Sequence, residues 1–317
     1  SSWCANEHNS LPGDKGPVRK TRGVNMHARI KIITAMLIFG SIGAFVRNIN
    51  LSSGEIAFLR GVIGSIFLIG ASFFLRQGPS YKSIKRNIAL LTLSGAALGI
   101  NWIFLFQAYE YTSIANATLS YYFAPIFVII LAPFILKEKL TPVRVVCVFA
   151  AMFGLFLIVK VGNANQDYSY NHTSGIIYGL LAAIFYASVI LMNKFIKNLS
   201  DFETTLVQLM SAVLVLFPYV ALKNGFSFSG LFGVNSNAII LILIVGIIHT
   251  GFAYFLYFTA IRDLKGQTIA VLSYIDPISA VIIAAVFLGE AMKSMQIIGG
   301  MLILGSTLLS EKLSVRI

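Results

Sequence analysis

Charged side chains are scarce in this sequence. Asp, Glu, Lys and Arg make up 11% of its 317 residues and hydrophobic residues make up 57%. A soluble globular chain has about 25% charged residues and about 45–50% apolar ones. With a mean hydropathy of +0.82, a soluble protein would have too little polar surface to stay dispersed. The composition therefore argues against intrinsic disorder and favours an integral membrane protein. The length of such a chain indicates how many membrane-spanning helices it can form rather than how many domains it has.

Cysteine and catalytic motifs are equally sparse. The two cysteines, Cys4 in a polar segment and Cys147 in an apolar run, imply no disulfide framework. Acidic residues number 12, and no Asp-rich cluster, His-Glu-x-x-His or Gly-x-Ser-x-Gly sequence occurs. We therefore expect no catalytic residues, no metal site and no cofactor, and a membrane-embedded enzyme is kept only as an alternative.

Ten apolar runs are candidates for crossing the hydrocarbon core, which needs about 20 residues, and the last of them is short. They lie near residues 30–48, 55–75, 88–109, 114–136, 143–161, 174–193, 204–222, 238–260, 268–289 and 295–310. The runs are continuously apolar, which predicts helices rather than the alternating strands of a barrel. We predict an all-α integral membrane protein with ten transmembrane helices.

Basic residues alternate between the connecting segments. Of the 24 Lys and Arg, 19 fall on one side of the ten spans and 4 on the other, with Arg60 inside a span. Because cytoplasmic loops carry the excess of Lys and Arg, both termini are predicted to be cytoplasmic in a multi-pass protein of the cell membrane. The net charge of +12 is thereby explained by topology, and we expect no nucleic-acid partner.

The chain repeats itself weakly. A tyrosine, a proline three residues later and a glutamate 13 residues after the proline recur in both halves, at Tyr122, Pro125 and Glu138 and again at Tyr274, Pro277 and Glu290. Each half holds five spans, and since five is odd the second half must enter the membrane inverted, as in many secondary transporters. We predict a disordered N-terminal extension over 1–27, a first five-helix repeat over 28–161 and a second over 162–317.

Two Ser-x-x-Glu sequences also occupy matching positions. Ser52 and Glu55 precede the second span, and Ser200 and Glu203 precede the seventh. This pattern predicts capping boxes that satisfy the free N–H groups at the start of each helix.

These features together resemble the drug/metabolite transporter superfamily, in particular its EamA-type ten-helix permeases. The features are the ten spans, the half-to-half repeat, the spaced proline and glutamate, and Arg60 early in the second span. The resemblance covers roughly residues 28–310 and implies a carrier of the cytoplasmic membrane that exports metabolites or amino acids by alternating access. Gln208 aligns with Arg60 in the second half, so the two gates need not work alike.

Ionisable residues inside the spans are the first candidates for function, because a central Asp or Arg costs about 2.5–3.5 kcal/mol on insertion scales. Asp276, beside Pro277, is assigned a substrate or proton role, the alternative being a carboxylate bonded structurally to Tyr or Ser. His249 belongs either to a proton relay or to the packed core. Arg60 acts in gating or anion binding, or else snorkels to the headgroups or pairs with Glu55.

Polar and aromatic side chains complete the predicted substrate site. The set comprises Ser41, Phe45, Asn101, Tyr121, Tyr122, Tyr178, Tyr186, His249, Ser273, Tyr274 and Asp276. Pro125 and Pro277 are predicted to kink their helices, either as pivots or as simple packing bends. A cavity with few fixed charges suits neutral, zwitterionic or aromatic solutes.

The sequence thus predicts a secondary-active exporter of small amphipathic metabolites, with amino acids as the first candidate substrates. No Gly-x-x-x-x-Gly-Lys-Ser/Thr loop is present to use ATP, so a gradient would supply the energy, with proton coupling as one candidate. The expected partners are a small-molecule substrate and the lipid bilayer, with the protein as a monomer or homodimer. A channel without gradient coupling is the other alternative.

Overall fold

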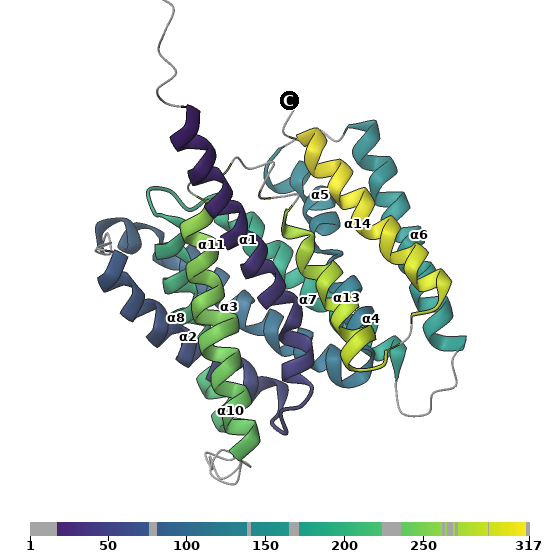
Figure 1. The fold of residues 1–317 in the computed structure, drawn as a ribbon, viewed down its shortest axis with the longest axis horizontal. Coiled ribbons are helices and arrows are strands. Elements are labelled where there is room, and N and C mark those ends of the chain that lie inside the picture. The colour runs from purple at the N-terminus through teal and green to yellow at the C-terminus, as the bar shows by residue number, and fades with distance from the viewer. Residues whose placement is uncertain are drawn as a thin grey trace, which may run out of the picture.

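The computed structural model describes residues 18–75, 81–137, 141–164, 171–223, 236–261, 264, 269, 272–290 and 292–314. Throughout this part of the chain the regular elements are helices (Figure 1). They are α1 (Val18–Val46), α2 (Ser53–Leu75), α3 (Tyr81–Tyr111), α4 (Ile114–Tyr121), α5 (Ala124–Ile135), α6 (Pro142–Ala164), α7 (His172–Asn193), α8 (Asp201–Lys223), α10 (Ser236–Ile244), η1 (Val245–Phe252), α11 (Ala253–Ile261), α13 (Ile275–Phe287) and α14 (Ser294–Ser314).

Seven described helical segments are long and apolar enough to cross a membrane. Three further apolar helices are shorter, namely Pro142–Ile158, Ile275–Phe287 and Ser294–Leu309. The prediction of an all-helical membrane protein is confirmed in this form. Helix α1 already begins at Val18 and so covers part of the extension predicted over 1–27, whose residues 1–17 lie outside the described chain.

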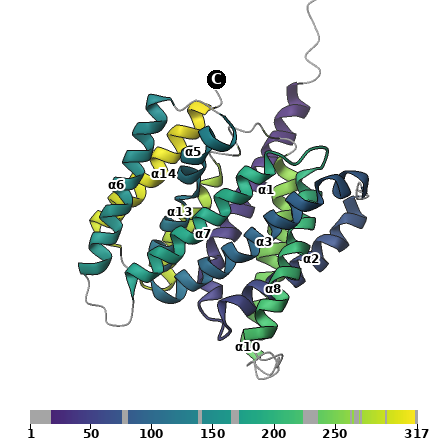
Figure 2. The ribbon, with the colours of Figure 1, turned by 180° about the vertical axis from the view of Figure 1, so that it is seen from behind.

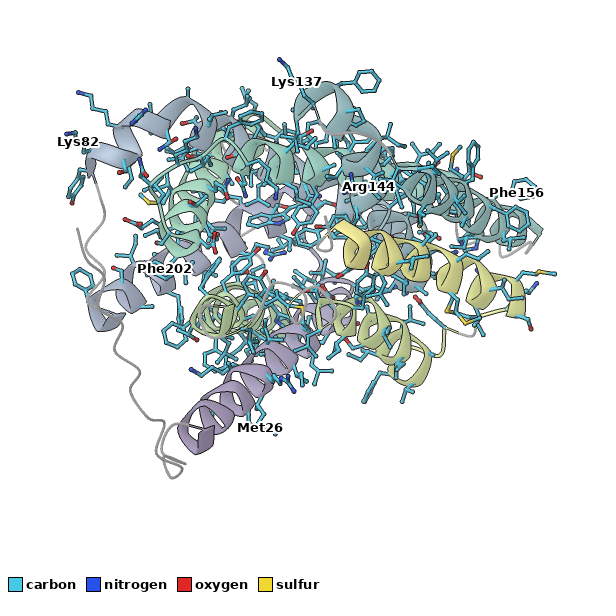
Figure 3. The ribbon with its side chains drawn as sticks, turned by 90° about the horizontal axis from the view of Figure 1, so that it is seen from above. Met26, Lys82, Lys137, Arg144, Phe156 and Phe202 are labelled. Atoms are coloured by element: carbon cyan, nitrogen blue, oxygen red, sulfur yellow. The ribbon has the colours of Figure 1, made fainter. Side chains whose placement is uncertain are left out.

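Apolar side chains cover the outer surface. Phe73 is 78% exposed, Leu214 73% and Phe287 77%, and Figure 3 shows Phe156 pointing away from the bundle. Monomeric soluble proteins rarely expose large contiguous apolar patches. This surface is therefore one that a bilayer solvates.

Most of the described helices pack together into one body, and two further helices pack against each other at its edge. In the body α3 packs against α7 and α8, α1 against α11 and α13, α2 against α8 and η1, and α4 and α5 against α7. Helices α6 and α14 lie side by side at one edge, as Figures 1 and 2 show from opposite directions. Both described ends of the chain lie on the same side of the molecule, at the top of Figure 1; we call this the termini side.

Both predicted capping boxes form. The Ser52 amide donates to Glu55 Oε2 at 2.9 Å, and the Ser200 amide donates to Glu203 Oε2 at 2.9 Å. In return each serine Oγ accepts from the amide of its glutamate. These bonds satisfy N–H groups that the first turns of α2 and α8 would otherwise leave free.

The run predicted as one span over 114–136 is interrupted. Helix α4 ends at Tyr121 and α5 begins at Ala124, with Pro125 as the second residue of the new helix. Proline has no N–H to donate and disfavours helical geometry at the residue before it. Its position therefore explains why the chain restarts a helix here, and a break at membrane depth is tolerated because it lies inside protein.

A stretch of π-helix joins α10 to α11. In η1 the Thr250 hydroxyl donates to the Val245 carbonyl five residues earlier, at 3.0 Å. A Cβ placed on Gly246 would lie 2.5 Å from Ile63, and one on Gly251 2.5 Å from Phe67, so η1 and α2 approach closely. Such stretches are often found at functional sites.

Helices α6 and α14 touch through glycine. A Cβ added to Gly154 would lie 2.5 Å from the Gly299 carbonyl oxygen, and one added to Gly299 would lie 2.5 Å from the Gly154 carbonyl oxygen. Small residues allow this close backbone approach, which drives helix association in lipid where the hydrophobic effect is weak.

We expect Gly299→Ala to destabilise the protein, because its methyl group would push the α6 backbone away at a cost of about 1–3 kcal/mol. Gly305→Ala in the same helix is the matched control, since a Cβ there meets nothing within 4 Å. Thermal unfolding of the two variants in detergent measures the difference. Equal midpoints for the two variants would contradict the packing described for α6 and α14.

Candidate functional site

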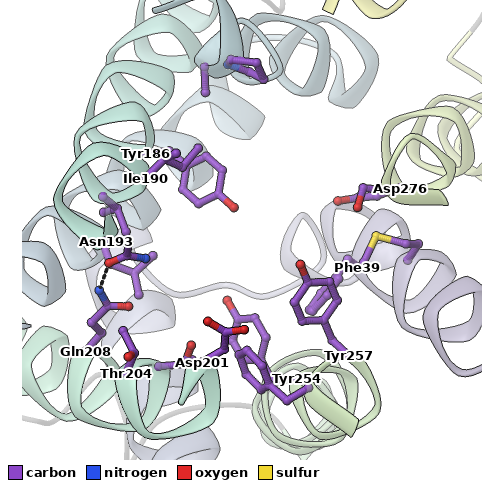
Figure 4. Close-up of a pocket in the computed structure, with 18 of the residues that line it drawn as sticks. Phe39, Tyr186, Ile190, Asn193, Asp201, Thr204, Gln208, Tyr254, Tyr257 and Asp276 are labelled. Atoms are coloured by element: carbon purple, nitrogen blue, oxygen red, sulfur yellow. Dashed lines mark hydrogen bonds between the residues drawn. The ribbon is translucent and has the colours of Figure 1, made fainter. Parts of the chain in front are cut away.

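A cavity of about 470 Å³ lies in the body of the molecule. Its volume is within the range of about 300–1,000 Å³ typical of small-molecule sites. Helices α1, α3, α4, α5, α7, α8, α11 and α13 contribute side chains to it. Figure 4 shows these side chains arranged around an open space, with Asp276 facing Tyr186 across it. We call this the first cavity.

A carboxylate marks one wall of the first cavity. Tyr122 donates its hydroxyl to Asp276 Oδ2 at 2.5 Å. Asp276 occupies the first turn of α13, where the N-terminal helix dipole favours negative charge. Among the described lining residues Asp201 is the second carboxylate, and none of them is Lys or Arg. The cavity therefore favours a ligand with a cationic or hydrogen-bond-donating group.

Amide and hydroxyl groups form the opposite wall. Gln208 Nε2 donates to Asn193 Oδ1 at 2.6 Å, drawn as the dashed line in Figure 4, and to Ser94 Oγ at 2.7 Å. These bonds connect α8 to α7 and α3. They hold the Gln208 side chain at the cavity wall in one orientation.

Aromatic rings line much of the remaining surface. Tyr121 and Tyr186 have ring centroids 5.4 Å apart, and Phe39 and Tyr254 have centroids 5.2 Å apart. Rings at these separations offer apolar faces to a ligand and, in tyrosine, a polar tip. The cavity is thus amphipathic.

The first cavity reaches helix ends on the termini side. Its lining includes Asn193 at the end of α7, Asp201 at the start of α8 and Ser273 just before α13. In Figure 1 the end of α11 and the start of α13 lie on the same side as the two described ends of the chain.

A second cavity, of about 600 Å³, lies on the opposite side of the body. It is lined by the end of α1, the start of α2 and the end of α3, including Phe106, Tyr109 and Glu110. On α1, Ser41 and Phe45 lie between Phe39, which lines the first cavity, and Val46, which lines the second. Ser41 shares a hydrogen bond of 2.9 Å with His249 Nε2, and the ring of Phe45 packs on the histidine with centroids 4.8 Å apart.

An ion pair lies on the side away from the termini. Arg47, just after α1, pairs with Glu290, which follows α13. Glu290 also accepts from the amides of Ile114 at 3.2 Å and Ala115 at 3.5 Å, where its charge complements the N-terminus of α4. One carboxylate therefore ties the ends of α1 and α13 to the start of α4.

Several sequence-predicted residues meet at the first cavity. Those lining it are Tyr121, Tyr122, Pro125, Tyr186, Ser273 and Asp276. The structure places the others elsewhere, namely Ser41, Phe45, Arg60, Asn101, Tyr178, His249, Tyr274 and Pro277. Asn101 Nδ2, for example, donates to the Ala182 carbonyl at 2.7 Å between α3 and α7. The ring of Tyr178 packs against Phe104 and Tyr111.

Other lining residues were not among the predictions. Tyr254 and Tyr257 reach the cavity from α11, and Thr204 reaches it from α8. The two tyrosines are three residues apart, which puts them on one helix face. The three-residue spacing could have indicated that both tyrosines face the same space. Aromatic residues are so frequent in this chain, however, that the pair is not distinctive in the sequence.

Known proteins resemble this chain over most of its length. The model of the EamA-like transporter family matches residues 28–160 and 173–311. The uncharacterized transporter YxxF of Bacillus subtilis is 34% identical over 262 residues, 83% of this chain and 82% of that protein. The riboflavin transporter ImpX of Fusobacterium nucleatum is 26% identical over 78% of this chain and 85% of its own. A solved crystal structure, 18% identical, shares the fold with a TM-score of 0.61 over 90% of this chain and 98% of its own.

We expect Glu290→Gln to lower stability more than Arg47→Gln, because the glutamate supports both the ion pair and the start of α4. Hydrogen bonds to charged groups contribute about 1.5–3 kcal/mol each. Arg47→Gln should also cost less in the Glu290→Gln background than alone, which a double-mutant cycle of unfolding midpoints measures. Additive effects would show that the two residues act independently.

Proposed function

Because the chain belongs to the EamA-like transporter family, we propose that it is a secondary-active exporter of small amphipathic metabolites, amino acids first, that works by alternating access. The family match confirms the resemblance noted in the sequence. The protein is thus a multi-pass membrane transporter. The substrate, the direction of transport and the coupling belong to the proposal.

The arrangement of the two cavities is the observation that carries this proposal. A carrier exposes its binding site to one side of the membrane at a time. Here the first cavity reaches helix ends on the termini side, and the second cavity, lined in part by Arg47, lies on the other side. We infer that the Arg47–Glu290 pair and the contact between Ser41 and His249 close the path between the two sides. If the termini are cytoplasmic, as the basic residues predict, this is the conformation in which an exporter loads its substrate.

The packing pattern supports two inverted repeats of five helices. In this correspondence α1 matches α7, α2 matches α8, α3 matches α10 to α11, α4 with α5 matches α13, and α6 matches α14. When each helix is replaced by its match, the main observed packed pairs become other observed packed pairs. The α3–α7 pair becomes α1–α11, and the α3–α8 pair becomes α2–η1. The pairs α2–α8 and α6–α14 map onto themselves. Two such halves can interconvert between mirror-related states of similar energy.

Helix ends support the same correspondence. Lys137, after α5, has φ of 57° and Gly289, after α13, has φ of 67°. Both residues precede the glutamate of the sequence repeat, although Glu138 itself lies outside the described residues. The left-handed residue ends each helix in the same way.

The lining supports an aromatic solute with an amine. Tyrosine rings provide stacking surfaces, and Asp276 provides the negative charge that a cationic group would pair with. One relative is named a riboflavin transporter, and riboflavin is another amphipathic aromatic solute. We therefore propose aromatic amino acids first and place riboflavin among the compounds to test.

Counterflow in proteoliposomes tests the proposal. Vesicles loaded with an unlabelled amino acid or riboflavin should take up the labelled compound in a saturable, exchange-dependent manner. Comparing metabolites accumulated in cells that lack or overproduce the protein would identify further substrates. Flux that does not saturate would instead indicate a pore.

We expect Asp276→Asn to reduce gradient-driven transport by about ten-fold or more, because it removes one of the two carboxylates among the described lining residues of the first cavity. Folding should survive, since the amide oxygen can still accept from Tyr122. Glu203→Gln is the matched control, because a glutamine serves equally in the capping box and lies outside the cavity lining. Normal transport by Asp276→Asn over a range of pH would contradict a role for this carboxylate.

A further inference from the structure

Arg60 is a buried cation in the middle of the molecule. Its residue is 4% exposed, so the guanidinium does not reach the membrane surface along α2. Glu55, considered from the sequence as a partner, caps the start of α2 instead. Within the described residues no carboxylate lies within ion-pair distance of Arg60.

The neighbours of Arg60 hold its position without neutralising it. The guanidinium carbon lies 4.3 Å from the centroid of the Trp102 ring and 5.4 Å from that of Phe106. Arg60 Nε donates to Thr250 Oγ1 at 3.1 Å, and that is the one hydrogen bond of the guanidinium to described residues. We call these four residues the Arg60 cluster. A buried charge without a partner is costly, and an ionisable group at membrane depth is by default a functional candidate.

The Arg60 cluster lies between the two cavities. Phe106 lines the second cavity, whereas Tyr254, one turn beyond Thr250, lines the first. The ionisable groups near Arg60 include Tyr109, which lines the second cavity, Tyr121 and Tyr254, which line the first, and His249. A solute passing from one cavity to the other would therefore pass the guanidinium.

We propose that the Arg60 guanidinium binds a carboxylate group of the transported solute. This assignment rests on the proposed function and extends it by naming a second recognition group. The terminal N–H groups of arginine match the two oxygens of a carboxylate in a bidentate pair, and the rings of Trp102 and Phe106 pack near the guanidinium. A single cation suits a monoanion better than a phosphate, whose second charge would stay uncompensated.

Trp102 supplies a direct measurement of this binding. The chain has two tryptophans, Trp3 and Trp102, so Trp3→Phe leaves one emitting ring, against which Arg60 stacks. Purified Trp3→Phe protein is titrated at constant ionic strength with phenylacetate and with its neutral analogue phenylacetamide. We expect a saturable change in emission for both, with half-saturation about ten-fold or more lower for phenylacetate, as a charge-assisted pair requires.

Variants in the Trp3→Phe background test whether Arg60 is responsible. Arg60→Gln should abolish the preference for the carboxylate, and Arg60→Lys should keep part of it, because lysine retains charge but not the bidentate geometry. Arg144→Gln at the start of α6 is the control for loss of an arginine and should keep the full preference.

Equal titrations with the two compounds, no response to either, or a preference that survives in Arg60→Gln would each overturn the assignment. The comparison of the two compounds in the Trp3→Phe protein needs no Arg60 variant, so the test holds even if Arg60→Gln fails to fold. Counterflow by the same protein reports separately on the proposed function. Counterflow without a carboxylate preference would remove only the role of Arg60.

Discussion

The requirement that every backbone polar group be satisfied inside the membrane governs this structure. Lipid offers no hydrogen bonds, and the long apolar segments that the structure describes are helical. Two departures from the α-helix within these segments pack against other helices. The break between α4 and α5 lies beside the first cavity, and η1 lies against α2.

The same requirement applies to side chains and explains how the polar interior is organised. Asp276 receives the Tyr122 hydroxyl, Gln208 connects two helices, and Glu290 accepts from a helix start and pairs with Arg47. Each of these contacts crosses between elements, and all except the Gln208–Asn193 bond join residues more than 100 positions apart. The groups that could recognise a solute are therefore also groups that hold the helices in their present arrangement, so a change of conformation must exchange some of these bonds for others.

The sequence was informative about residue types that cost much free energy to place inside a membrane. Asp276 was identified because a carboxylate within a span has few explanations, and both capping boxes because their spacing has a specific geometric meaning. Amides and aromatics carry less information. Asn101 on α3 bonds to a neighbouring backbone, whereas Asn193 on α7 lines the cavity. Distinguishing the two requires the rotation of each helix about its axis, which packing determines and which a nearly uniform apolar sequence does not encode.

The π-helical stretch has a consequence for the geometry downstream of it. An α-helix advances about 100° per residue, and the wider turns of η1 absorb extra chain without adding much length. The direction in which Tyr254 and Tyr257 project is thus set by the residue count within η1, not by α11 itself. If the same residues were wound as a regular α-helix, α11 would be turned about its axis by the rotation that η1 absorbs, and both phenol rings would point in another direction.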